Sequence, residues 1–257
     1  MVSQSLMNYM GYLEIAICLA ALCFLTVKRQ WRDYWATGSF LAVRAVADSI
    51  LTLLWHSIYG QDHHKNHHTA YLAYFYIYWT TFAIESLLAL SIVYSIYRLT
   101  MKPLKGLQRF GSIFFCVVAG ITVVATVGWT FASYSMGPRF FIAATSYLQR
   151  NQSLLTLCML LVVFCAMRPT GISGGSKIFG VGLGLGVLAA CDLVRTWWLA
   201  AHLNMYRTYS AINGVVICAI LLLWTAYFAL PEPERREIDV RSPLLRWNRM
   251  LLNRASS

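Results

Sequence analysis

Seven long apolar runs constrain the fold of this chain more than any other feature, because a helix needs about 20 apolar residues to cross a bilayer core. We expect membrane spans at about residues 6–27, 34–58, 70–97, 110–134, 140–167, 178–203 and 206–230. These runs are too long for barrel strands and do not alternate in polarity. Only 12% of the residues are charged, about half the share of a soluble domain. The sequence therefore predicts an all-α membrane protein, a bundle of seven transmembrane helices, and excludes a water-soluble enzyme.

The positions of the basic residues predict how the bundle is oriented. Lys and Arg concentrate in the loops at 28–33, 98–109 and 168–177 and in the tail, whereas the opposite side has only Lys65, Arg139 and Arg207. By the positive-inside rule, the N-terminus lies outside and the C-terminus is cytoplasmic. The net charge of +11 thus reflects topology, and we expect no nucleic-acid partner.

Residues 231–257 form a basic tail in which we expect a short amphipathic helix at about 243–254. One face of this helix is an apolar arc of Leu244, Leu245, Trp247, Leu251 and Leu252. The opposite face carries Arg246 and Arg249. Such a helix is typical of one that lies on anionic lipid headgroups at the bilayer surface. Docking to a cytoplasmic protein partner is the alternative.

Ionisable residues inside membrane spans are costly and point to function by default. The chain has seven of them: Glu14, Arg44, Asp48, Glu85, Arg150, Asp192 and Arg195. Arg44 and Asp48 are four residues apart and Asp192 and Arg195 three apart, so both pairs could form within one helix.

These charges fall in the middle and outer half of the bundle, together with aromatic and amide residues of the third and fifth spans. Two interpretations remain open: a structural ion-pair network, or an outward-facing ligand pocket between spans two, three, five and six. The candidate pocket residues are Arg44, Asp48, Tyr78, Trp79, Glu85, Gln149, Arg150, Gln152, Asp192 and Arg195.

Two sets of histidines have spacings that metal sites use. His63, His64, His67 and His68 in the second loop could bind a metal ion, although such loops are often only a soluble surface. His56 and His202 near span ends could hold a haem iron, although polar histidines at helix ends are common. No lysine lies inside a span, which excludes a retinal Schiff base, and the sequence identifies no cofactor.

Span six contains Gly180, Gly182, Gly184 and Gly186, two interleaved patterns that permit close helix approach. We expect packing within the bundle, with dimerisation as the alternative.

Several stretches resemble an uncharacterised family of small seven-span integral membrane proteins found largely in acidobacterial genomes. They are YIYWTTFAIESLLALSIVYSIYRL, MKPLKGLQRFG, YLQRNQSLL, FGVGLGLGVLAACDLV and the closing ALPEPERR and LLRWNRMLL. The family has no established activity and supplies no functional residues. The resemblance implies a bacterial inner membrane.

The residues favour a non-enzymatic sensor or small-molecule-binding accessory protein whose tail reports to a partner. A transporter of a small solute or a proton-coupled substrate is the alternative. A haem-containing or lipid-modifying membrane enzyme is a third reading, because intramembrane acids could serve acid–base catalysis, but no nucleophile–base pair is readable.

Overall fold

A computed structural model describes residues 4–59, 67–135, 137–201, 206–234 and 247–248, and this part of the chain is helical without strands. The helices are α1 (Gln4–Val27), α2 (Trp35–Tyr59), α3 (His67–Thr100), α4 (Lys105–Ser133), α5 (Pro138–Met167), α6 (Lys177–Ala201) and α7 (Tyr206–Ala229). All seven are long and apolar enough to cross a membrane. The prediction of an all-α fold with seven helices that could each span a membrane is confirmed for the described residues.

The helix ends differ most from the prediction between α3 and α4. Helix α3 continues to Thr100 and α4 begins at Lys105, three and five residues beyond the predicted limits. Charged residues end an apolar run but not a helix, because Arg, Lys and Gln favour helical conformation. With 34 residues, α3 is about 51 Å long and extends past a hydrocarbon core of about 30 Å.

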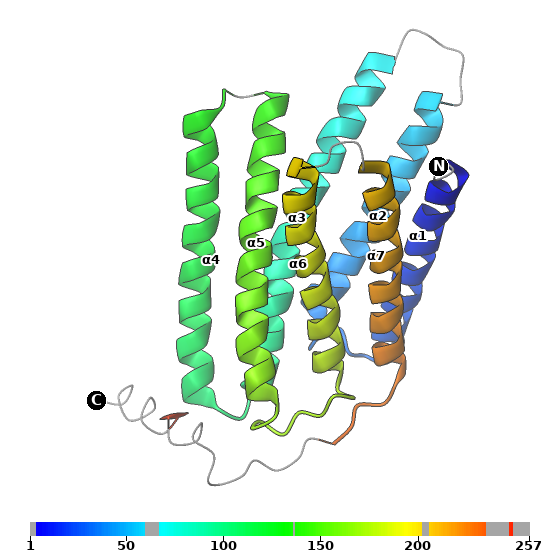
Figure 1. The fold of residues 1–257 in the computed structure, drawn as a ribbon. Coiled ribbons are helices and arrows are strands. Elements are labelled where there is room, and N and C mark those ends of the chain that lie inside the picture. Colours follow the sequence, from blue (N-terminus) through cyan, green and yellow to red (C-terminus); the bar gives the residue numbers. More distant parts are fainter. Residues whose placement is uncertain (1–3, 60–66, 136, 202–205, 235–246, 249–257) are drawn as a thin grey trace.

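Six of the helices form a closed ring, in the order α1, α2, α3, α5, α6, α7 and back to α1. Helix α4 lies outside this ring against α5 and α3, at one edge of the bundle in Figure 1. Helices α3 and α6 also contact each other across the ring. The chain therefore surrounds a central space with six helices and leaves α4 at the periphery.

Large apolar side chains are buried at the end of the bundle where α7 ends, which is the bottom in Figure 1. Leu25, Leu41, Ile96, Trp224 and Phe228 are each no more than 1% exposed and come from the ends of α1, α3 and α7 and the start of α2. We call these five residues the apolar plug. Within a bilayer such side chains stabilise the bundle by van der Waals packing between helices, and close packing excludes solvent from this end.

The glycines of α6 serve packing between helices of one chain. A Cβ on Gly180 would overlap the ring of Tyr227, and one on Gly184 would overlap the indole of Trp224, both on α7. A Cβ on Gly182 or Gly186 would meet Leu160 of α5 at 3.6 and 3.5 Å. The expectation of intramolecular packing is confirmed, and the two interleaved patterns face two different neighbours.

The tail contacts the start of α4. The side-chain oxygen of Asn248 accepts hydrogen bonds from the backbone N–H groups of Gly106 (2.8 Å) and Leu107 (3.3 Å). These N–H groups belong to the first turn of α4, where backbone N–H groups have no carbonyl acceptor within their own helix. The rest of the predicted amphipathic helix at 243–254 lies outside the described residues.

Candidate functional site

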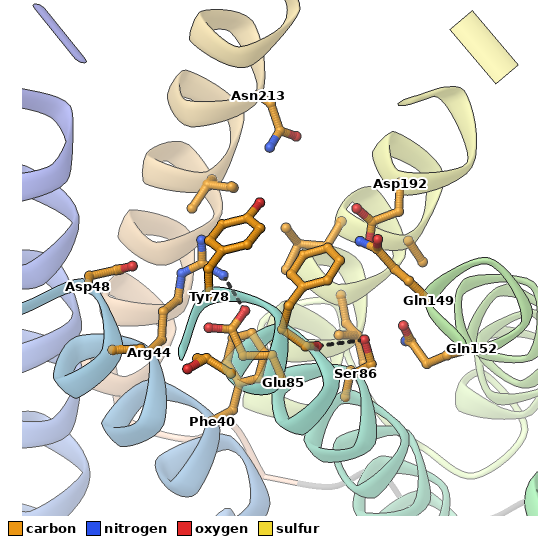
Figure 2. Close-up of a pocket in the computed structure, with 18 of the residues that line it drawn as sticks. Phe40, Arg44, Asp48, Tyr78, Glu85, Ser86, Gln149, Gln152, Asp192 and Asn213 are labelled. Carbon is orange, nitrogen blue, oxygen red and sulfur yellow. Dashed lines mark hydrogen bonds and ion pairs between the residues drawn. The ribbon is translucent and has the colours of Figure 1, made fainter. Parts of the chain in front are cut away.

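A cavity of about 190 Å³ lies in the ring, lined by residues of α2, α3, α5, α6 and α7 (Figure 2). Arg44 stands nine residues into α2 and Asp192 fifteen into α6, which places them about 14 and 22 Å from the end of the bundle that carries the plug. The cavity thus lies above the apolar plug and near the middle of the spans. It is smaller than the 300–1,000 Å³ typical of drug-sized ligands.

One wall of the cavity carries an ion-pair cluster. Arg44 forms ion pairs with Glu14 of α1 and, at 3.1 Å, with Glu85 of α3, and the three side chains are only 13–15% exposed. The spacing allows Arg44 to pair with Asp48 within α2, but among the described residues the carboxylates within 4 Å of Arg44 are those of Glu14 and Glu85. Neighbouring helices present carboxylates to both sides of the guanidinium, and an Arg four residues before an acid is the less favourable order within a helix.

Asp48 lies beside this cluster with an unsatisfied oxygen. Its Oδ2 atom is buried and has no hydrogen-bond partner within the described part of the chain. Buried acceptors in native proteins are rarely left without a donor, so each exception calls for an explanation.

The opposite wall carries a second polar cluster. Arg195 donates a hydrogen bond to the Oε1 atom of Gln149, and its guanidinium lies 5.1 Å from the ring centre of Phe82. Asp192 lies close to Gln149 (Figure 2), and Arg195 follows it three residues further along α6. Gln149 and Gln152 are buried at 7% and 5% exposure, and the amide of Gln152 donates to Thr156 (3.0 Å).

Together the two clusters contain four carboxylates, of Glu14, Asp48, Glu85 and Asp192, and two guanidiniums, of Arg44 and Arg195. If all were ionised, the site would have two surplus negative charges. A surplus of that size in a low-dielectric interior requires bound protons or a bound cation.

A column of aromatic rings on α3 reaches the cavity. Tyr74, Tyr78 and Phe82 repeat every four residues, and successive rings are nearly parallel, with centres 6.4 and 6.0 Å apart. Trp55 of α2 extends the column, with its ring centre 6.2 Å from that of Tyr74. Tyr78 lies between the two polar clusters in Figure 2. The faces of these rings are sites where a cation is favoured.

Eight of the ten predicted pocket residues line the cavity, and two do not. Arg150 is exposed on α5, because the side chains of Gln149 and Gln152 take the inward face of that helix. Trp79 packs against the rings of Phe75 and Phe82 instead, with both pairs of centres 6.2 Å apart.

The sequence interpretation missed a contribution from α7. Asn213 lines the cavity at its upper side in Figure 2, and Ser86 of α3 lies on its wall. Uncharged polar residues inside spans are the signal that could have identified both, as such residues did for Gln149 and Gln152 of α5.

The histidine predictions remain untested. His63, His64 and His202 lie outside the described residues, and His67 and His68 begin α3. His56 is exposed near the end of α2. Among the residues that the structure describes, no group of three or more His, Cys, Asp or Glu side chains is arranged to hold a metal ion.

No protein-family model, curated protein or solved structure matches this chain. The resemblance to the acidobacterial family therefore stays a prediction.

Proposed function

We propose that this protein is a non-enzymatic membrane sensor or binding accessory that holds a small organic cation, such as a primary ammonium ion, in the charged cavity. The observation that carries the proposal is that Asp48, a residue of the cavity wall, has a buried Oδ2 atom without a donor among the described residues. An ammonium group would donate to this oxygen and would reduce the surplus of negative charge.

The surroundings of Asp48 favour a cation over an anion. Both guanidiniums at the cavity are engaged, Arg44 by two carboxylates and Arg195 by Gln149 and Phe82. An anionic ligand would have to displace those partners. The aromatic column would give a cation a favourable path to the site.

The proposed orientation follows the basic residues. The positive-inside rule places the loops around Lys28, Arg98 and Arg168 in the cytoplasm. The plug end is then cytoplasmic, and the cavity opens toward the outside. The bacterial inner membrane remains the proposed location.

The packing supports a binding protein over the alternative of a transporter. A transporter has to open a path to the second side, and the apolar plug closes the bundle below the cavity with side chains of at most 1% exposure. Uptake of labelled methylammonium into proteoliposomes would favour the transporter instead.

The test measures thermal unfolding of the purified protein in mild detergent with increasing isopropylammonium, using isopropanol and isobutyrate as neutral and anionic controls. We expect isopropylammonium alone to raise the Tm, since a ligand at 100 times its Kd stabilises by about 2.7 kcal/mol. The variant Asp48→Asn should lose this shift. Arg150→Gln, which removes an exposed charge near the same depth, should keep it.

A Tm shift with isobutyrate but not with the ammonium ion would contradict the proposal. So would an equal shift in Asp48→Asn. Absorbance and native mass spectra of the same sample would report any bound haem or co-purified solute.

A further inference from the structure

A second, larger cavity lies at the opposite end of the spans from the aromatic column and outside the ring. It has a volume of about 630 Å³ and lies between the start of α2, the end of α3 and the start of α4. Its charged walls carry Arg32, Arg98, Lys102 and Lys105, with Asp33 as the acid. We call it the basic cleft.

The charge of the basic cleft is not compensated locally. Four cations face one carboxylate, which leaves three surplus positive charges. Among the described residues, none of the four cations has a carboxylate within 4 Å. Arg44 in the central cavity, by contrast, has two. Free cations gathered in a concave surface form an anion site.

The walls of the cleft are fixed by hydrogen bonds. The hydroxyl of Ser95 donates to the carbonyl oxygen of Asp33 (3.3 Å), which ties the loop before α2 to α3. The amide of Gln108 donates to the carbonyl oxygen of Arg98 (3.0 Å), which ties α4 to α3. The cleft is therefore formed before any ligand arrives, which lowers the entropic cost of binding.

The position of the cleft matches the boundary between hydrocarbon and water. Helix α2 begins at Trp35, which is 48% exposed, and Tyr94 lies in the cleft wall. Trp and Tyr are enriched at the level of lipid headgroups. The exposed ring of Trp35 in the cleft wall gives an apolar surface beside the charges, along which an acyl chain can lie.

We propose that the basic cleft binds the phosphate group of an anionic phospholipid, with Arg98 and Lys102 as its principal ligands. The same phosphate chemistry could come from a soluble phosphate compound, but the exposed ring of Trp35 in the cleft wall favours the lipid. Basic pockets between transmembrane helices bind such headgroups in other membrane proteins. This site is separate from the central cavity and does not depend on the proposed function.

The test uses native mass spectrometry of the full chain in detergent, titrated with phosphatidylglycerol or phosphatidylcholine. We expect preferential binding of phosphatidylglycerol. The double variant Arg98→Gln, Lys102→Gln should weaken this binding about 30-fold, because each lost charge interaction with the headgroup weakens it about fivefold. A matched control, Arg29→Gln with Arg168→Gln, removes two exposed cations at the same end outside the cleft and should bind as the unaltered protein does.

Three results would overturn the proposal. Equal binding of the two lipids would mean that the cleft does not select anionic headgroups. An equal loss in the control variant would assign the binding to general surface charge. Competition by inorganic phosphate or glycerol phosphate at concentrations equal to those of the lipid would identify a soluble ligand. If the double variant fails to fold, the single variant Arg98→Gln with an expected loss of about fivefold replaces it.

Discussion

The cluster around Arg44 gives the sharpest prediction about stability. Replacing Arg44 by Met leaves the carboxylates of Glu14 and Glu85 buried, at 13% and 15% side-chain exposure, without their cation. Removing one partner of a buried ion pair costs about 3–5 kcal/mol, chiefly because the remaining charge is left uncompensated. We therefore expect Arg44→Met to lower the free energy of unfolding by about that amount. The measurement is unfolding by SDS titration in mixed micelles.

A neutral version of the same cluster tests the reasoning. The triple variant Glu14→Gln, Arg44→Met, Glu85→Gln removes all three charges, and neutral replacements of buried ion pairs are often harmless. We expect its stability to lie within about 1 kcal/mol of the unaltered protein. Arg150→Met is the control for loss of an exposed arginine and should change stability by no more than about 0.5 kcal/mol. The argument fails if Arg44→Met is as stable as this control, or if the triple variant is as unstable as Arg44→Met.

Two further predictions concern packing and the tail. Gly184→Ala should destabilise by about 1–3 kcal/mol, because its Cβ would overlap a buried indole, whereas Gly120→Ala, with open space at its Cβ, should be neutral or slightly stabilising in the same unfolding assay. Asn248→Ala should cost about 1 kcal/mol through the loss of a cap on α4 and should speed proteolysis of the tail, whereas Trp247→Ala, at a side chain 60% exposed, should leave the cleavage rate unchanged.

The number and type of the helices could be predicted from the sequence because bilayer thickness sets the length of an apolar run. The helix limits could not, since Lys105 belongs to α4 although it lies outside the hydrocarbon-like run. Hydropathy reports where lipid lies, whereas hydrogen bonding sets where a helix ends.

The residues of the cavity could be predicted in large part because buried charges in a membrane protein face inward. The exception, Arg150, shows the limit of that rule. Adjacent positions on a helix face different directions, and a run of five polar residues does not indicate which of them face the interior. The pairing of the charges also depended on tertiary structure. Glu14 lies in another helix, 30 residues before Arg44 in the sequence, and no spacing rule predicts that the two residues pair.

The closed ring has a consequence for how the protein is made. Glu14, Arg44 and Glu85 lie in α1, α2 and α3, three helices that are synthesised one after another. When Arg44 enters the membrane, its partner Glu14 is already there, and Glu85 follows one helix later. The buried charge of Arg44 is thus compensated in the order of synthesis. The ring itself stays open until α7 is inserted beside α1. Until then, the pairing of Glu14 with Arg44 lets α1 and α2 reside together in the lipid before the helices of the second cavity wall are inserted.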